Sequence, residues 1–114
     1  MEPGATFHCE VIKLNADEFG NRVTDIKCHG RLIGNAANEL KDVVKPLIPA
    51  GGRIIINLGD VSYLDSSGLG ALVALKVTAV RQGFCILEFA EMTPRVMDLL
   101  RISNLSQILS SKGS

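Results

Sequence analysis

The chain has 114 residues, of which 46% are apolar and 21% are charged. This length and apolar share fit one domain with a core of its own, stable without disulfides or metals. Twelve basic and twelve acidic residues cancel to a net charge of zero, so the basic surplus typical of nucleic-acid-binding domains is missing. The longest apolar-leaning stretch, Leu69 to Val80, is too short to span a membrane.

Cysteine usage and the N-terminus indicate the cytoplasm. The three cysteines are odd in number and lack a C-x-x-C spacing, so they do not form the framework of a disulfide-stapled secreted domain. The start Met1-Glu2-Pro3-Gly4 lacks the basic residues and apolar run of a signal peptide. We therefore expect a cytoplasmic protein.

The first half of the chain predicts a hairpin and a helix. Residues Phe7 to Leu14 and Val23 to Cys28 are strand-like and flank a turn-rich segment, which predicts an antiparallel hairpin centred near residues 18 and 19. Asn35 is a suitable N-cap for the helix that follows, and Pro46 should distort and end that helix. The apolar stripe of this helix consists of Leu40, Val43, Val44 and Leu47.

The run Arg53 to Leu58 is continuously β-branched, which predicts a central strand buried on both faces, with Ile55 in the core. Residues 60–65 are expected to form a loop. A long helix capped by Asp65 or Ser66 then runs to about Gln82 and stops at Gly83.

The remaining elements complete the pattern of an α/β domain. Phe84 to Phe89 predicts a strand, Pro94 begins a short helix, and Leu105 to Leu109 predicts a last turn or short helix before a polar tail at residues 110–114. The order β-β-α-β-α-β-α with a terminal helix favours a mixed sheet of four to five strands flanked by about four helices.

The segment from Asn57 to Gly70, N-L-G-D-V-S-Y-L-D-S-S-G-L-G, carries the functional information. Asp65, Ser66 and Ser67 cluster at the start of the long helix, where free backbone N–H groups and the helix dipole favour an anion. A phosphate on Ser66 would leave the helix folded and change the surface charge, as a binding switch requires. The alternative from the residues alone is that the serines only cap the helix.

The motif D-V-S-Y-L-D-S-S-G-L-G, after an I-I-I-N-L strand, resembles the signature of the STAS domain, named for sulfate transporters and anti-sigma factor antagonists. It is most similar to the free-standing bacterial antagonists of the stage II sporulation AA type. Supporting matches are G-R-L after the second strand, V-R-Q-G at the end of the long helix, and T-P-R-V-M-D-L-L-R-I-S-N-L near the C-terminus. The resemblance implies a STAS fold and a single STAS domain over residues 1–114.

The resemblance also implies a function. Family members carry a phosphorylatable serine directly after the loop aspartate, which here is Ser66. The unphosphorylated antagonist binds an anti-sigma factor that is also its serine kinase, which frees a sigma factor, and phosphorylation ends the binding. A non-enzymatic regulator of transcription is therefore expected, with a PP2C-type phosphatase as a further partner and no cofactor. The sequence leaves a homodimer open.

One position departs from the family pattern. Many members have an acidic residue after the G-x-L that follows the second strand, whereas here Gly30-Arg31-Leu32 is followed by Ile33. This difference bears on the identity of the kinase and on the efficiency of phosphorylation, and not on the fold.

The outer face of the long helix is a predicted docking surface, because the helix contains only two charges, Lys76 and Arg81, and the family docks through this region. The residues assigned to the sheet side are Leu69, Leu72, Val73 and Val80. The residues that then lie outward are Ala71, Ala74, Leu75 and Thr78. The other switch-loop and partner-binding residues predicted around Ser66 are Asp60, Tyr63, Asp65, Ser67 and Gly68. The alternative is that one exposed leucine is ordinary.

Three other features of the sequence suggest functions of a different kind. A zinc site is one such alternative, because His8-Cys9 and Cys28-His29 lie on the two hairpin strands. Neighbouring side chains of a strand point to opposite faces, so buried reduced cysteines are favoured over a zinc site. Cys85 is also expected in the core.

An enzyme is a second alternative. The sequence L-D-S-S-G lacks the first glycine of the nucleophile elbow G-x-S-x-G, which disfavours an enzyme. The competing function is a phosphorylatable STAS scaffold subunit of a larger signalling assembly, without direct control of a sigma factor.

Overall fold

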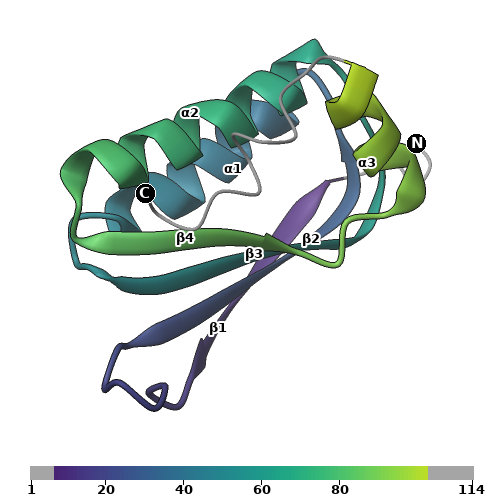
Figure 1. Cartoon of the computed structure of the whole chain (residues 1–114). Helices are drawn as coiled ribbons and strands as arrows, with labels where there is room; N and C mark the ends of the chain where they lie inside the picture. Colours follow the sequence, from purple (N-terminus) through teal and green to yellow (C-terminus); the bar gives the residue numbers. More distant parts are fainter. Residues whose placement is uncertain (1–6, 103–114) are drawn as a thin grey trace.

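The computed structural model describes residues 7–102, which form a four-stranded mixed sheet with helices packed against it (Figure 1). The elements in chain order are β1 (His8–Leu14), β2 (Val23–Leu32), α1 (Ala36–Val44), the 3-10 helix η2 (Lys45–Leu47), β3 (Gly52–Leu64), α2 (Ser66–Gln82), β4 (Cys85–Ala90) and α3 (Pro94–Ile102). The predicted α/β class and mixed sheet are confirmed. The last turn expected at Leu105 to Leu109 and the tail at residues 110–114 lie outside the described residues.

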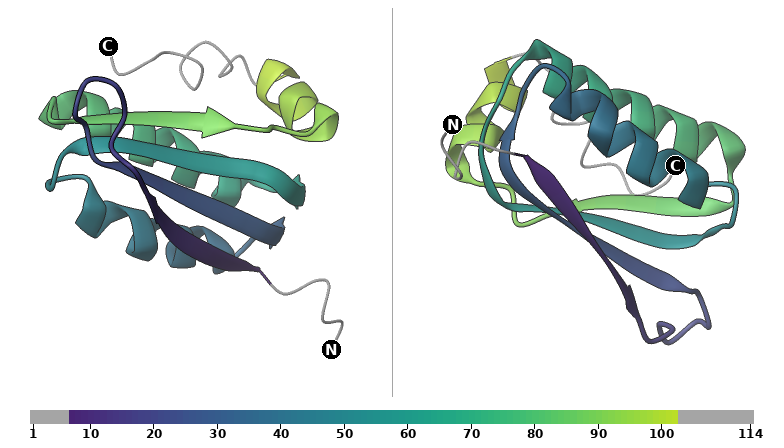
Figure 2. Two further views of the ribbon diagram at one scale, coloured as in Figure 1. Left: turned by 90° about the horizontal axis from the view of Figure 1, so that it is seen from below. Right: turned by 180° about the vertical axis from the view of Figure 1, so that it is seen from behind.

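The strands lie in the order β1-β2-β3-β4, with β1 antiparallel to β2 and the other two pairs parallel. The predicted hairpin is confirmed, and its register pairs Cys9 with Cys28. Parallel neighbours need crossover connections, and α1 and α2 supply them. Figures 1 and 2 show these two helices side by side over one face of the sheet, with α3 beside one end of it.

Because α1 and α2 cover one face of the sheet, β3 is a central strand that is buried on one side. Ile54, Ile56 and Leu58 point into the core, whereas Ile55 between them remains partly exposed. The expectation that this strand is buried on both faces was therefore wrong. A run of β-branched residues is compatible with burial on one face or on both. When all its residues are apolar, the strand lacks the alternation of apolar and polar residues that otherwise identifies a strand with one exposed face.

The strand β3 also continues through the segment where a loop was expected. Residues 60–64 remain paired with the end of β2, from His29 opposite Asp60 to Leu32 opposite Leu64. The register shifts once just before this span and once within it. Val61 and Leu64 are buried against the core. Burial of these side chains and pairing with the extended β2 keep the segment in the sheet, so the turn before α2 is short and tightly held.

The helices α1 and α2 follow the sequence prediction in their bounds. Leu40 and Val44 of the predicted α1 stripe are buried, and Pro46 converts the end of α1 into the 3-10 helix η2. Asn35 occupies the N-cap position of α1 without a side-chain capping hydrogen bond. Gly83 ends α2 in the left-handed conformation, with a φ of 77°. Among residues 7–102, no helix has the length and apolarity needed to cross a membrane.

Candidate functional site

Asp65 holds the start of α2 in place. Its backbone is extended, its Oδ1 accepts the backbone N–H of Gly68 at 2.9 Å, and its Oδ2 accepts the backbone N–H of Gly34 at 3.1 Å. One carboxylate therefore caps α2 and ties it to the loop between β2 and α1. These hydrogen bonds, that from Gly68 first, lower the pKa of Asp65, so the group is ionised at neutral pH. Of the two predicted caps, Asp65 is the one used.

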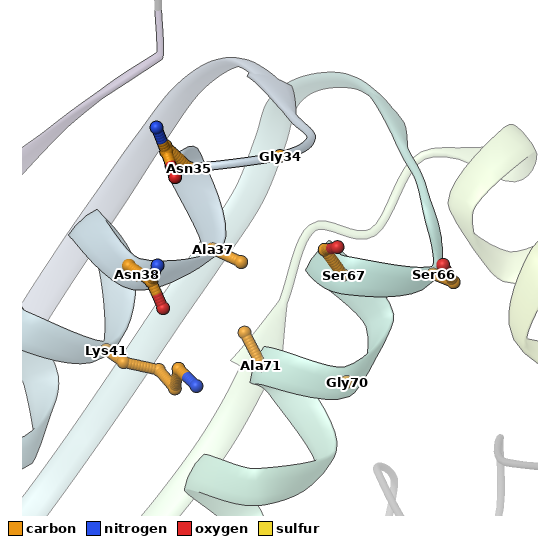
Figure 3. Close-up of a pocket in the computed structure, with 9 residues that line it drawn as sticks. All are labelled: Gly34, Asn35, Ala37, Asn38, Lys41, Ser66, Ser67, Gly70 and Ala71. Carbon is orange, nitrogen blue, oxygen red and sulfur yellow. The ribbon is translucent and has the colours of Figure 1, made fainter.

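Ser66 and Ser67 are the first two residues of α2, and both are exposed. Both line a cleft of about 740 Å³ between the starts of α1 and α2 (Figure 3). The other residues that line the cleft are Gly34, Asn35, Ala37, Asn38, Lys41, Gly70 and Ala71. Figure 3 shows the Lys41 side chain reaching from α1 toward the α2 side of the cleft, and Ser67 nearer to α1 than Ser66. The two hydroxyl groups are thus open to another protein.

Gly68 fixes how closely α2 approaches the sheet. It is buried, and a Cβ at this position would lie 2.1 Å from the backbone oxygen of Leu32. A side chain cannot be accommodated there without moving the helix or the end of β2. Gly68 was predicted to contact a partner, and its burial shows that it instead allows the close packing that presents Ser66.

The predicted outward face of α2 is wrong by part of a turn. Ala71 and Leu75 were expected in solvent, but both are buried, Leu75 with only 1% of its surface exposed. Val80, which was assigned to the sheet side, is exposed, and Thr78 is partly buried with its hydroxyl donating to the Ala74 carbonyl at 2.8 Å. Of the four residues predicted to lie outward, Ala74 alone is exposed.

Lys76 lies on the buried side of α2 although it carries a charge. It is 1% exposed, and its Nζ donates to the backbone oxygen of Leu87 at 2.7 Å. Its pKa is lowered because burial disfavours the charged form. Lys76 therefore lies on the side of α2 that packs on β4. The buried face of α2 consists of Gly68, Ala71, Leu72, Leu75, Lys76 and Ala79.

The exposed residues over the first three turns of α2 form an uncharged strip, and the exposed Arg81 lies beyond it near the end of the helix. We call it the α2 strip and define it as Ser66, Ser67, Gly70, Ala74 and Val77. Gly70 and Val77, like Asn38 and Lys41 across the cleft, were missed by sequence reasoning. A helical period counted from a buried Gly68 would have identified Gly70, Ala74 and Val77. A substitution that probes the strip belongs at Ala74, since a charge at Leu75 would be buried.

Asp60 and Tyr63 lie away from the cleft. Asp60 Oδ2 is 2.6 Å from His29 Nδ1, and Glu10 Oε1 is 2.6 Å from His29 Nε2, so one imidazole bridges β1 and β3. The His8 ring stacks on His29 at 4.6 Å between centroids. The Tyr63 ring is covered by the guanidinium of Arg95 from α3, 5.6 Å from its centroid. The predicted site residues thus fall into two separate groups.

The bridge at His29 predicts a pH dependence of stability. Hydrogen bonds to Asp60 and then Glu10 raise the pKa of His29 above 6.5, because only the imidazolium can donate from both ring nitrogens. Its contribution is therefore complete below pH 6.5 and is lost as the pH rises through the higher folded-state pKa. The effect should be small, because the side chains of Glu10 and Asp60 are 55% and 73% exposed.

The measurement is a urea denaturation series between pH 6 and pH 9, with a parallel NMR titration of the His29 ring. The native chain should lose stability relative to an Asp60→Asn, Glu10→Gln double variant as the pH rises, and the double variant should titrate at a lower pH. An equal titration midpoint in both proteins would show that the two carboxylates do not hold the imidazolium.

Comparison with known proteins places this geometry in a family. The STAS domain profile matches residues 16–112 of the chain. The chain belongs to the STAS domain family. This STAS domain is 33% identical over 86 residues to the anti-sigma-B factor antagonist of Staphylococcus aureus, covering 75% of this chain and 79% of that protein. It is 31% identical over 83 residues to a STAS-domain containing protein of Pseudomonas aeruginosa, covering 73% of this chain and 81% of that protein.

Solved structures of antagonists share the fold of this STAS domain. The anti-sigma factor antagonist SpoIIAA in its unphosphorylated form superposes with a TM-score of 0.68 at 19% identity, covering 88% of this chain and 84% of SpoIIAA. An anti-sigma factor antagonist from Mycobacterium paratuberculosis superposes with a TM-score of 0.71 at 15% identity, covering 94% and 86% of the two chains. The fold and the family expected from the D-S-S-G-L-G motif are confirmed.

Proposed function

We propose that this STAS domain is an anti-sigma factor antagonist switched by phosphorylation of Ser66. In its unphosphorylated form it binds an anti-sigma factor with serine kinase activity, and a sigma factor is released. The observation that carries the proposal is the exposed Ser66 at the first position of α2, directly after the capping Asp65 and at the edge of the cleft. Relatives named as anti-sigma-B factor antagonists and the known phosphorylated form of SpoIIAA support it.

The absence of charge on the α2 strip explains how a phosphate would prevent partner binding. A partner can cover the uncharged strip without desolvating an ion. Phosphorylation adds about −1.5 to −2 charges at Ser66. The first turn of a helix stabilises an anion by about 0.3–1 kcal/mol, so the domain stays folded. A partner that covers the strip would then have to desolvate the phosphate, and binding is lost.

The proposed role is regulatory and cytoplasmic, with a PP2C-type phosphatase restoring the unmodified form.

Catalysis by Ser66 is disfavoured because a serine nucleophile needs an adjacent base. Both ring nitrogens of His29 are occupied by Glu10 and Asp60, which engages that imidazole elsewhere. The serine is therefore proposed as the target of a kinase.

Ser66→Glu should bind the purified anti-sigma factor at least about tenfold more weakly than the native chain, because a buried unpaired carboxylate is costly at an interface. Ser66→Ala should bind within about threefold of the native chain and remain folded, since Asp65 makes the capping hydrogen bond and surface substitutions are nearly neutral. Isothermal titration calorimetry measures the affinities, and circular dichroism checks the fold.

Ser67→Glu is the matched control, since it adds the same charge one residue further along the helix. It should weaken binding less than Ser66→Glu does. If Ser66→Glu binds as tightly as the native chain, the phosphorylation switch at this serine is wrong, and the scaffold function without sigma-factor control gains support.

A further inference from the structure

Two cysteines of the hairpin face each other directly. Cys9 of β1 and Cys28 of β2 are register partners in the antiparallel pair, and both are free thiols. Directly opposed residues in such a pair have Cα atoms about 4.5–5.5 Å apart, within the range of about 4.4–6.8 Å that a disulfide spans. Both side chains pack on the core side of the sheet, whereas His8 and His29 stack together. The spacing of register partners therefore suits a disulfide between Cys9 and Cys28.

The two thiols differ in environment in a way that assigns them different roles. Cys9 is partly exposed on the edge strand, whereas Cys28 on the neighbouring strand is buried, so Cys9 is the more accessible of the two thiols. A hydrogen bond with the Cys28 thiol lowers the pKa of Cys9, and the same contact together with burial raises the pKa of Cys28. The thiolate is the reactive form of cysteine, so Cys9 is the attacking group and Cys28 the resolving one.

We propose that Cys9 and Cys28 form a peroxide-responsive dithiol that closes to an intramolecular disulfide between β1 and β2. The Cys9 thiolate attacks one oxygen of hydrogen peroxide, forming an S–O bond as the O–O bond breaks, and the departing hydroxide takes a proton to become water. The Cys28 sulfur then attacks the Cys9 sulfenic acid, forming the S–S bond as the S–O bond breaks, and the second water carries away the Cys28 proton. Two thiols lose two electrons and one peroxide becomes two waters.

The disulfide would link the edge strand β1 covalently to β2. Among the described strands, β1 is paired only with β2, and it forms one edge of the sheet. Closing the loop from residue 9 to residue 28 removes freedom from the unfolded chain and stabilises the fold. Such reversible disulfides are the kind found in reducing compartments. The pair lies on the hairpin and not in the Ser66 cleft, so the inference stands apart from the proposed function.

The test uses the full chain, reduced and freed of reductant, and then treated with a small excess of hydrogen peroxide. Free thiols should fall from three to one, and the intact mass should fall by two hydrogens without forming a covalent dimer. Dithiothreitol should restore all three thiols. The oxidised chain should melt about 5 °C or more above the reduced chain.

Three variants assign the bond. Cys85 is the matched control, since it is buried on β4 at the opposite edge of the sheet, about 14 Å from β1 and about 10 Å from β2 by strand spacing. Cys85→Ala should lose two thiols on oxidation as the native chain does, whereas Cys9→Ser should lose none. Cys28→Ala should stop at a Cys9 sulfenic acid that dimedone traps. The proposal is overturned if the native chain keeps three thiols, if the disulfide joins two chains, or if Cys9→Ser still loses two thiols.

Discussion

Gly68→Ala should lower the free energy of unfolding by about 3 kcal/mol or more, because the new methyl group would collide with a backbone oxygen and not with a movable side chain. A Cβ at Gly68 lies 2.1 Å from the Leu32 oxygen and 3.0 Å from the Leu32 Cγ. Relief requires α2 to lift from the end of β2, which would also strain the hydrogen bond from the Gly34 backbone N–H to Asp65. Urea denaturation followed by circular dichroism measures the loss.

Gly70→Ala is the matched control for this substitution. Gly70 lies two residues further along the same helix, it is exposed, and a Cβ there would meet nothing within 4 Å. Replacing it should raise stability by about 0.5–1 kcal/mol, since alanine loses less backbone entropy than glycine in a helix. Equal effects of the two substitutions would contradict the close approach of α2 to β2.

Ile56→Ala should cost about 2–5 kcal/mol, as expected for truncation of a large aliphatic side chain in a packed core. Ile56 is 0% exposed and lies in the middle of the strand that pairs with both β2 and β4. Ile55→Ala should cost less than half as much, because this neighbour is partly exposed on the sheet face that α1 and α2 leave uncovered.

Thermal and urea unfolding of the two isoleucine variants compare the two faces of the sheet directly. The larger loss should occur at Ile56. A loss at Ile55 as large as that at Ile56 would show that the opposite face of β3 is also closed in solution, as the sequence alone suggested.

The hairpin and the start of α2 could be predicted because local patterns determine them. Alternation on either side of a turn predicts the pairing of Cys9 with Cys28, and the aspartate of D-S-S-G at a helix start is a capping signal in its own right. The family resemblance then added the role of Ser66, which the physical chemistry of two exposed serines does not provide. From the residues alone, the two serines at the start of α2 are compatible with helix capping and with phosphorylation.

The phase of α2 and the length of β3 could not be predicted because distant parts of the chain decide them. Most residues of α2 are small or apolar, so several helical phases are compatible with its sequence, and the burial of Lys76 with its hydrogen bond to Leu87 is seen only in the structure. Likewise Gly59-Asp60 reads as a turn, and only pairing with the extended end of β2 keeps this segment in the sheet. The apolar sequence at the start of β3 also does not indicate which face of the sheet the helices leave uncovered.

Phosphate mapping on the full chain tests the central claim most directly. The protein is incubated with its anti-sigma factor kinase and ATP, digested, and analysed by peptide mass spectrometry, with Ser66→Ala and Ser67→Ala treated in parallel. Phosphate should appear on Ser66 in the native chain and in Ser67→Ala, and Ser66→Ala should remain unmodified. Phosphate on Ser67 alone, or on neither serine with a kinase shown to be active, would contradict the switch at the start of α2.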